Sequence, residues 1–313
     1  MAGGAVAGGP VLALVGPTGA GKSELALEAA ERLGAELVAV DAFTLYREMD
    51  VGTAKPGLRE RRRIPHHCLD LLDVEQDADV AWFQATARAA IADIRDRGRT
   101  PLLVGGSGLY FRAVVDPLEL PPTDPAVRAD VGRRHGGDPA SAHAALRAVD
   151  PRAAALIDPG NLRRTIRALE VHALTGRRFS EYRTTWDAYD SIYPRLRVVG
   201  VERSREELTK RIAARTEAML EGGLIEECRV LRGRSLSVTA QAAIGYAEVM
   251  AHLAGRCTLE EAAERIRVRT RRYAVRQQRW FTADPRVHWT PPAGVVDALV
   301  SAVRGAGETD HAS

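Results

Sequence analysis

Short apolar runs alternate with amphipathic segments along the first half of the chain. Val11–Val15 is a continuous apolar run, as expected of a strand buried on both faces of a sheet. Glu24–Leu33 has its apolar residues at helical spacing, and Gly34 follows as a helix-end signal. These two patterns predict strands at 11–15, 36–40, 101–104 and 196–201 and helices at 24–33 and 81–97. Strands that alternate with helices predict a doubly wound parallel α/β sheet.

The composition changes after about residue 120. The stretch 120–194 opens with Pro121-Pro122, is rich in Ala and Arg, and has helical periodicity without strand runs. Residues 205–281 also have a helical pattern and are strongly basic. We therefore expect an α/β core over 10–119, a helical insertion domain over 120–194, completion of the core with basic C-terminal helices over 195–304, and flexible tails at 1–9 and 305–313.

The composition excludes several classes of protein. Apolar residues make up 45% of the 313 residues and charged residues 27%, which excludes a disordered chain and a fibre. No apolar run approaches the roughly 20 residues that a membrane helix needs. The first ten residues lack Lys and Arg, and Cys68, Cys228 and Cys257 have no paired or metal-ligand spacing. We expect a monomeric, cytoplasmic protein with no membrane partner.

Lysine is rare in a chain that is otherwise rich in basic residues. Of 44 Lys and Arg residues only Lys22, Lys55 and Lys210 are lysines, and the formal net charge of +3 is too small to indicate a nucleic-acid partner by itself. Because the bias toward arginine reflects overall composition, a retained lysine weakly indicates a site that needs a compact ammonium group. Lys22 and Lys55 both fall within motifs.

One glycine-rich segment has the pattern of a phosphate-binding loop. Residues 16–23 fit G-x-x-x-x-G-K-[ST] between a predicted strand and a predicted helix, the context that supports this motif. Backbone N–H groups can surround phosphate oxygens, Lys22 adds positive charge, and the Ser23 hydroxyl can bind Mg²⁺. The predicted diphosphate or nucleotide site comprises Gly16, Pro17, Thr18, Gly19, Ala20, Gly21, Lys22 and Ser23. The alternative is a glycine-rich turn that carries Lys-Ser by accident.

The strand ends beside this loop carry different residues. Strand 101–104 runs into Gly105-Gly106-Ser107 without an acid, which counts against ordinary nucleotide hydrolysis. Asp41 follows strand 36–40, at the sheet edge where ligands bind in α/β proteins. It is a candidate general base, or a partner of Mg²⁺ through water. The alternative is an aspartate that only caps a turn.

Motifs in a constant order over nearly the whole chain resemble one family. They include Asp41 and the segment Tyr46–Pro56 with its Gly-Thr-Ala-Lys-Pro ending. The others are Gly16–Ser23, Ile64–His67 with Leu69-Asp70, Phe83-Gln84, Leu103–Tyr110, Asp124–Arg128, Arg163–Val171, Ala243–Tyr246 and Thr270–Phe281. From about residue 11 to 289 the chain is similar to the tRNA dimethylallyltransferase family. The resemblance implies a P-loop NTPase-like α/β fold with a helical insertion.

The resemblance also implies a reaction. The family transfers a dimethylallyl group from dimethylallyl diphosphate to N6 of adenosine-37, beside the anticodon of tRNA, and uses Mg²⁺. On this interpretation Asp41 accepts the N6 proton, Lys22 neutralises the departing diphosphate, and Ser23 binds Mg²⁺. Ser107, where the family usually has Thr, orients Asp41 or the base, and Arg215 is a second group for the diphosphate.

Contacts with the tRNA anticodon stem-loop are implied in the same way. An extruded adenine needs a pocket, phosphates pair with arginines, and splayed bases stack on aromatic rings. The implied tRNA-binding residues are Asp41, Ala42, Phe43, Thr44, Ser107, Arg128, Arg163, Arg164, Arg167, Gly245, Tyr246, Arg276, Gln277 and Trp280. For each arginine the alternative is a solvated helix face, and for Trp280 it is a place in the core.

Several positions depart from the family pattern. Ala42-Phe43-Thr44 stand where the family often has Ser and, two residues later, Gln. Ala247, Val275 and Thr282 replace residues that are usually basic. These departures concern how tightly the chain binds tRNA, and which tRNAs. We expect no zinc, since the chain lacks the C-terminal Cys/His element of some eukaryotic relatives.

Three other functions share part of these features. An adenylate isopentenyltransferase would use the same loop and Asp41 on free AMP, ADP or ATP, without needing the basic helices. A small-molecule P-loop kinase fits the loop but not the missing acid or the basic helical region. A non-catalytic relative would bind tRNA only. His66, His67 and Asp70 are expected to make structural hydrogen bonds in a loop rather than to act in catalysis.

Overall fold

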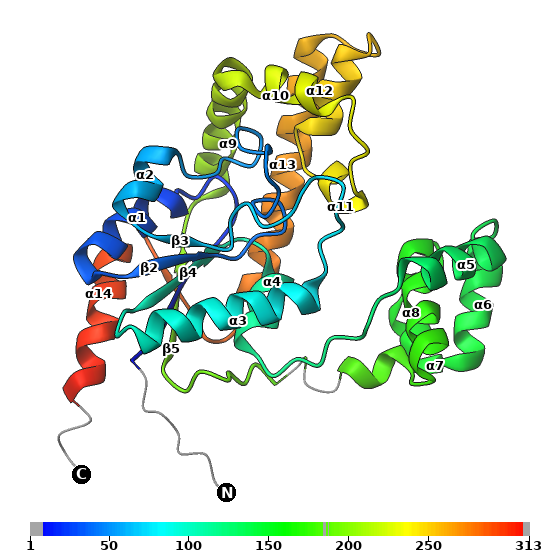
Figure 1. Cartoon of the computed structure of the whole chain (residues 1–313), viewed down its shortest axis with the longest axis horizontal. Coiled ribbons are helices and arrows are strands. Elements are labelled where there is room, and N and C mark those ends of the chain that lie inside the picture. The colour runs from blue at the N-terminus through cyan, green and yellow to red at the C-terminus, as the bar shows by residue number, and fades with distance from the viewer. Residues whose placement is uncertain (1–8, 184–185, 187, 309–313) are drawn as a thin grey trace, which may run out of the picture. The chain divides into compact units, whose positions relative to one another are not determined.

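A six-stranded parallel sheet forms the centre of the computed structural model, which describes residues 9–183, 186 and 188–308 (Figure 1). The strand order is β3-β2-β4-β1-β5-β6, and every neighbouring pair is parallel. The strands are β1 (Val11–Val15), β2 (Glu36–Ala39), β3 (His66–His67), β4 (Pro101–Gly105), β5 (Leu196–Val201) and β6 (Val287–Thr290). The parallel α/β sheet predicted from the apolar runs is confirmed.

The two outermost strands were not predicted from the sequence. β3 consists of His66 and His67, which pair with Leu37 and Val38 of β2. The histidine pair therefore lies in an edge strand, and the loop expected there is wrong. β6 is a four-residue strand beside β5. Both strands take their place from pairing with a longer neighbour, and neither is long enough to show its own periodicity.

Helices α1 (Lys22–Leu33) and α14 (Pro292–Glu308) pack together on one face of the sheet (Figure 1). Their apolar residues share one buried cluster with the strands, including Leu12, Ala29, Val296 and Leu299. α14 extends over Pro292–Glu308, and the expected start of a flexible tail at residue 305 stays a prediction. The expected tails at 1–8 and 309–313 lie outside the described residues.

Aromatic contacts join α3 (Val80–Asp96), α4 (Gly108–Val115) and α13 (Leu259–Thr282). The rings of Phe83 and Tyr110 lie 4.8 Å apart between centroids, and those of Phe111 and Phe281 lie 5.9 Å apart. α9 (Arg205–Met219) contacts α13, and α12 (Tyr246–Leu253) contacts both α13 and α10. The remaining elements here are α2 (Leu58–Arg63), a π-helical turn (Leu220–Leu224), α10 (Ile225–Leu231) and α11 (Val238–Gln241).

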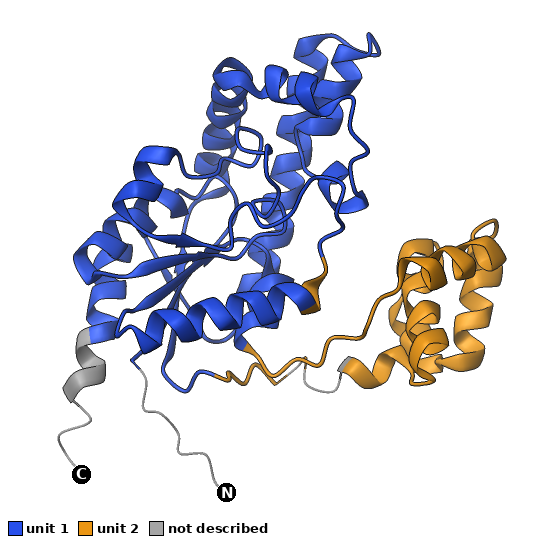
Figure 2. Cartoon of the chain, in the orientation of Figure 1, with its two compact units in different colours: residues 1–78, 82–115, 193–313 blue, residues 79–81, 116–192 orange. Residues whose placement is uncertain are grey.

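The chain divides into two compact units (Figure 2). Unit 1 comprises residues 1–78, 82–115 and 193–313 and contains the sheet, and unit 2 comprises residues 79–81 and 116–192. Three helices of unit 2 begin with Asp-Pro, in which Asp124, Asp138 and Asp150 accept N–H bonds of the first turn and proline starts the helix. The elements of unit 2 are α5 (Pro125–His135), α6 (Pro139–Val149), α7 (Pro151–Leu156), α8 (Leu162–Thr175) and a 3₁₀ helix (Phe179–Arg183).

Candidate active site

The glycine-rich loop connects β1 directly to α1, as the motif predicts. Gly19 has φ 82° and Gly21 has φ 92°, values that residues with a Cβ atom rarely adopt. The loop ends at Gly21 and α1 begins at Lys22. The unpaired N–H groups of the first helical turn therefore follow immediately, and such a helix N-terminus favours an anion.

The side chain of Lys22 bends back over this loop. Its Nζ donates hydrogen bonds to the carbonyl oxygens of Gly16 at 3.0 Å and Pro17 at 2.8 Å. Burial, with a smaller contribution from the positive charge of Arg215, lowers the pKa of Lys22 to about 8, while Asp41 opposes the shift. The ammonium group is therefore charged at neutral pH but close to its titration point.

Asp41 lies two residues beyond the end of β2 and caps the turn that follows. Its Oδ1 accepts a hydrogen bond from the N–H of Phe43 at 2.8 Å. Burial raises the pKa of the carboxyl group, and the Phe43 N–H, Lys22 and Arg215 partly oppose that rise. Asp41 also lines the same cavity as Lys22. Asp41 thus both caps a turn and lines the cavity beside the phosphate-binding loop, so the two alternatives offered by the sequence are compatible.

Arg215 is the second cation of the site and is half-buried, as Lys22 is. It lies on α9, and its Nη1 donates to Thr18 Oγ1 at 3.2 Å. Burial lowers the pKa of Arg215 and Asp41 opposes this, although a guanidinium group stays protonated in any case. Two further arginines, absent from the sequence prediction, support the loop from outside: Arg211 Nε donates to Gly19 O at 2.7 Å and Arg203 Nε to Ala20 O at 3.2 Å. Arg211 lies four residues before Arg215 on the same helix, and this spacing could have identified Arg211 from the sequence.

A cavity of about 200 Å³ joins these groups. Its polar lining includes residues of the glycine-rich loop, Asp41 and Arg215, and the larger part of the lining is apolar. Thr44 also lines the cavity, and its buried Oγ1 has no hydrogen-bond partner among the described residues. Ser107 is not among the lining residues, so its contact with Asp41 stays a prediction. The apolar part of the wall comes from Ala26, Leu27, Leu37, Val104, Ile212, Met219, Ala243, Ile244 and Ile266.

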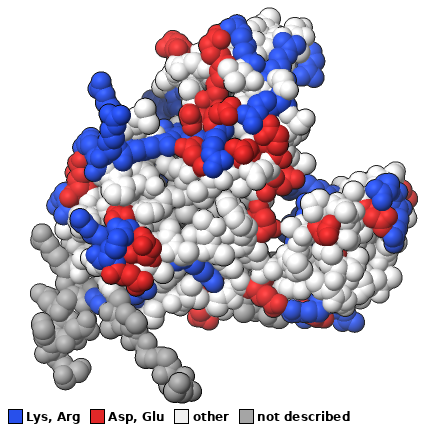
Figure 3. All heavy atoms as spheres, in the orientation of Figure 1, with Lys and Arg blue, Asp and Glu red and all other residues white. Residues whose placement is uncertain are grey.

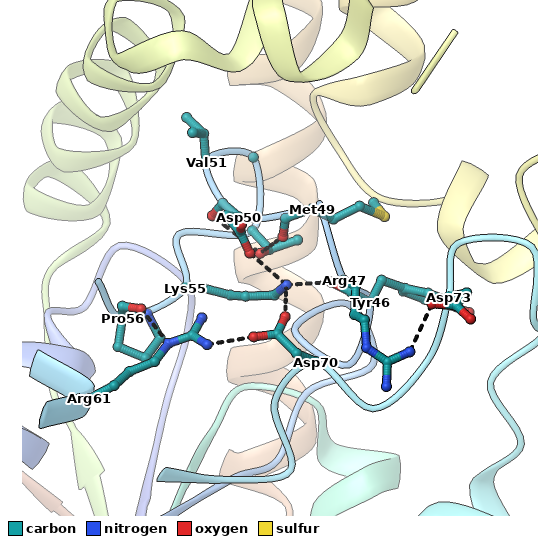
Figure 4. A network of polar contacts seen from close by, with 12 residues as sticks. Tyr46, Arg47, Met49, Asp50, Val51, Lys55, Pro56, Arg61, Asp70 and Asp73 are labelled. Carbon is teal, nitrogen blue, oxygen red and sulfur yellow. Dashed lines mark hydrogen bonds and ion pairs between the residues drawn. The ribbon is translucent and has the colours of Figure 1, made fainter. Parts of the chain in front are cut away.

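The segment Tyr46–Pro56 forms part of the wall and is held by the second retained lysine (Figure 4). The Lys55 side chain is 1% exposed, and its Nζ donates to Asp50 Oδ1 at 2.8 Å, Asp70 Oδ1 at 2.6 Å and the carbonyl oxygen of Tyr46. Arg61 Nη1 donates to the other oxygen of Asp70 at 2.5 Å. All three Lys55 protons are thereby used, and the structural role expected of Asp70 is confirmed.

Glu227 of α10 holds the same segment from the other side. Its Oε2 accepts the N–H groups of Asp50 at 2.9 Å and Val51 at 2.8 Å, and its Oε1 accepts the N–H of Gly52 at 3.2 Å. The Tyr246 hydroxyl also donates to Oε1, at 2.5 Å. Tyr246 is 0% exposed, so its ring offers no face to a base, contrary to the predicted stacking. Gly245 is buried beside it as the start of α12.

The two histidines of β3 make structural hydrogen bonds, as expected. His66 Nδ1 lies 2.7 Å from Ile64 O, and His67 Nε2 lies 2.7 Å from Glu36 Oε2. Arg97 Nη2 also donates to Glu36 Oε2, at 2.9 Å. Hydrogen bonds from Arg97, then from His67, lower the pKa of Glu36 to about 2 against its burial. His66 additionally lines the cavity.

Comparisons with known proteins identify the family. Residues 44–284 match the family model described as IPP transferase, and residues 9–70 match the one described as Isopentenyl transferase. A tRNA dimethylallyltransferase of a Nocardioides species is 49% identical over 299 residues, which is 94% of this chain and 96% of that protein. One of Streptomyces coelicolor is 48% identical over 291 residues, or 92% of this chain and 91% of that protein.

The chain belongs to the tRNA dimethylallyltransferase family, the IPP transferases. Solved structures agree. The full-length tRNA isopentenylpyrophosphate transferase of Bacillus halodurans is 35% identical, with a TM-score of 0.69 over 96% of this chain and 99% of that one. A eukaryotic dimethylallyltransferase that acts on tRNA is 26% identical, with a TM-score of 0.76 over 90% of this chain and 73% of that one. The P-loop NTPase-like fold predicted for the family is thus confirmed.

The arginines that the family resemblance points to in unit 2 divide into two pairs. Arg128 of α5 binds the buried carboxylate of Glu170 on α8, with Nε–Oε2 2.8 Å, and so holds the two helices together. Arg167 pairs with the same carboxylate within α8, with Nη1–Oε2 3.1 Å. Arg163 and Arg164 are exposed at the start of α8 and form no ion pair within the described part of the chain. Arg128 is exposed as well, so ion pairing rather than exposure separates the two pairs.

On α13 the predicted residues also separate by exposure. Arg276 and Trp280 are exposed, whereas Gln277 is 4% exposed and reaches the glycine-rich loop. Arg272 and Arg279 are exposed on the same side as Arg276, and helical spacing could have identified them as part of one basic stripe. Figure 3 shows basic and acidic side chains interspersed on the face it draws, in keeping with the low net charge. No helix among the described residues is long and apolar enough to cross a membrane.

Proposed function

We propose that this chain transfers the dimethylallyl group of dimethylallyl diphosphate to N6 of adenosine-37 in tRNA, releasing diphosphate. The observation that carries the proposal is the meeting of Lys22, Arg215 and Asp41 around one cavity beside the phosphate-binding loop. Relatives that match more than nine-tenths of the chain are named tRNA dimethylallyltransferases, which supports the choice of donor and acceptor. Monomeric, cytoplasmic action remains part of the proposal.

The donor fits the two kinds of lining in the cavity. The loop N–H groups, Lys22 and Arg215 offer cationic groups for the diphosphate, and the apolar wall suits a five-carbon chain. Mg²⁺ is usually held by one or two protein oxygens together with substrate phosphates, and Ser23 on this cavity fits that pattern. The described residues contain no cluster of three His, Cys, Asp or Glu that would form a closed metal site. A bound Mg²⁺ would neutralise charge on the leaving group.

The reaction follows from the placement of these charges. The lone pair of N6 attacks the allylic carbon bonded to oxygen, the carbon–oxygen bond breaks, and its electron pair leaves with the diphosphate. Lys22 and Arg215 stabilise that developing negative charge, which fixed cations in a desolvated site do effectively. Asp41 takes the proton from N6, and its raised pKa makes it a stronger base than an exposed aspartate. The apolar wall limits access of water to the allylic cation.

Thr44 provides a polar group for the acceptor. A buried hydroxyl without a partner is uncommon in folded proteins and calls for an explanation. Thr44 Oγ1 is such a group, and it lies on the cavity with Asp41 and Phe43. A purine bound there can satisfy it, in place of the Gln that the family often carries at this position. This supports an adenine site beside Asp41 and Thr44 on the cavity wall.

The test combines donor, acceptor and base in one assay. The purified chain is incubated with dimethylallyl diphosphate, Mg²⁺ and an unmodified anticodon stem-loop, and the RNA is analysed by mass spectrometry. We expect one dimethylallyl group on stem-loops with A37 and none on a matched stem-loop with G37. The Asp41→Asn variant is expected to lose at least about 100-fold in rate while its affinity for the stem-loop stays unchanged.

The other outcomes are informative in different ways. Prenylation of free AMP without prenylation of RNA would show that the acceptor is a free nucleotide. Transfer of the γ-phosphate of labelled ATP to a small molecule would support a kinase instead. Full activity of Asp41→Asn would disprove the general-base role, and tRNA binding without any transfer would indicate a non-catalytic relative.

A further inference from the structure

Gln277 joins α13 to the phosphate-binding loop. Its Oε1 accepts a hydrogen bond from the backbone N–H of Thr18 at 2.8 Å, and its side chain is almost completely buried. The hydroxyl of the same Thr18 accepts the hydrogen bond from Arg215. Thr18 is therefore held at two points, by α13 through its backbone and by α9 through its side chain.

The Gln277 amide is fixed on its other side as well. A Cβ atom at Gly106 would lie 2.2 Å from Gln277 Nε2, so the amide lies directly against the backbone that follows β4. Only glycine leaves that space, which gives a physical reason for the Gly-Gly sequence there. The Tyr273 side chain, one helical turn earlier, lines the same cavity as Gln277. The amide is thus confined between the loop and the end of β4.

The position of Gln277 on α13 separates it from the exposed residues of that helix. Ile266, Thr270, Tyr273 and Gln277 all line the cavity, at spacings of four, three and four residues that place them on one face. Arg276 and Trp280 lie on exposed parts of the helix. A side chain this buried, already bonded to the loop, has little surface left for RNA.

We propose that Gln277 is a positioning residue for the diphosphate group, acting by holding Thr18 and the phosphate-binding loop in place, rather than a residue that binds tRNA. The inference rests on the proposed function for the identity of the diphosphate substrate. Without the Gln277 acceptor, the partly buried Thr18 N–H loses its partner, so the loop shifts to find another. The loop N–H groups and Arg215 are then no longer oriented before the anion arrives, and preorganisation of this kind determines affinity for a charged group.

The test uses Gln277→Met, which keeps the length of the side chain and removes the acceptor. The matched control is Gln278→Met on the same helix turn. Calorimetry measures the Kd for magnesium pyrophosphate, and steady-state kinetics measures KM separately for dimethylallyl diphosphate and for the stem-loop. For Gln277→Met we expect about a tenfold rise in the pyrophosphate Kd and in the donor KM, the size of effect of one hydrogen bond. The stem-loop KM is expected to stay within twofold, and Gln278→Met to change neither constant.

A rise in the stem-loop KM with unchanged pyrophosphate affinity would overturn the proposal and return Gln277 to the tRNA-binding set. No change in any of the three constants would overturn it too. Gln277→Glu keeps an acceptor for Thr18 but adds negative charge, so it is expected to bind pyrophosphate more weakly than the wild type while keeping its melting temperature. Pyrophosphate binding requires no RNA, so the pyrophosphate Kd tests the role of Gln277 even if the wild-type chain fails to prenylate the stem-loop. That failure would count against the proposed function alone.

Discussion

Lys22 and Asp41 show how burial and charge oppose each other within one site. Burial disfavours the charged form of each group, so the pKa of Lys22 falls and that of Asp41 rises. Each group also favours the charged form of the other. The pKa of Lys22 thereby moves down toward neutral pH and the pKa of Asp41 moves up toward it. These shifts suit a cation that binds diphosphate and a carboxylate that takes a proton.

The pH dependence of donor capture follows from these shifts. As pH rises through about 8, Lys22 of the free enzyme loses its charge, so kcat/KM for dimethylallyl diphosphate is expected to fall. At low pH the same constant falls as Asp41 becomes protonated, at a pH above the ordinary range of an aspartate. In the complex the diphosphate favours the ammonium form, so the alkaline decline of kcat is expected at higher pH.

Lys22→Arg is the variant that checks this assignment. A guanidinium group does not titrate in this range, so the alkaline decline of kcat/KM should disappear, at a lower overall rate because the planar group fits the loop less well. Titration of the substrate is the same in both profiles and cancels in their ratio. An alkaline decline that is unchanged in Lys22→Arg would mean that another group causes it.

At the scale of elements, the segment Tyr46–Pro56 carries cavity residues without regular secondary structure of its own. Glu48 and Ala54 have φ of 63° and 51°, which cost free energy in residues other than glycine. Such a conformation persists only where its surroundings determine it. Here Lys55 binds the segment on one side and Glu227 on the other, and Gly52, Thr53 and Ala54 are thereby held on the cavity wall.

Removing the Lys55 ammonium group should loosen this wall. Lys55→Met leaves Asp50 and Asp70 facing each other without their shared cation. We expect the free energy of unfolding to fall by about 2 kcal/mol, less than the loss of about 3–5 kcal/mol for a fully buried pair, because both carboxylates are partly exposed. Urea denaturation measures this change, and the donor KM should rise as well.

The chain supplies a matched control for that variant. Lys210 is 75% exposed and pairs with Glu206 of its own helix, at 2.7 Å. Lys210→Met should change the free energy of unfolding by less than about 0.5 kcal/mol. Equal effects of the two substitutions would show that Lys55 is no more important than a surface lysine.

The sequence predicted the site best where chemistry depends on local pattern. The loop 16–23 and Asp41 could be placed because a motif and a strand end determine them. Tyr246 was assigned to RNA stacking because a sequence does not show that Glu227, nineteen residues away, takes its hydroxyl into the core. Arg128 was grouped with the arginines free to bind RNA for a similar reason, since its partner Glu170 lies on another helix and is recognisable only once α5 and α8 pack together. Arg167 lies three residues before Glu170 on the same helix, a spacing that the sequence does show. Pairing and burial between distant segments are what the sequence pattern lacks.

At the scale of the whole molecule, each unit presents exposed arginines. Unit 2 has Arg163 and Arg164 at the start of α8, and unit 1 has the stripe Arg272, Arg276 and Arg279 on α13. None of these five residues forms an ion pair with the residues that the structure describes. An enzyme for free nucleotides has no use for such groups far along the chain from its loop, whereas a stem-loop offers phosphates to both.

Salt dependence of binding tests whether both units contact the RNA. Each arginine–phosphate contact contributes about 0.7–0.9 to the slope of log K against log salt concentration. The double variant Arg163→Ala/Arg164→Ala should therefore reduce the slope for the stem-loop by about 1–2, and the triple α13 variant by about 2–3. Arg133→Ala/Arg134→Ala is the control, since those exposed arginines of unit 2 already pair with Asp130. If only the α13 variant changes the slope, unit 2 does not bind phosphates of the stem-loop. If neither variant changes the slope, recognition depends on the cavity alone, and a free nucleotide becomes the better candidate for the acceptor.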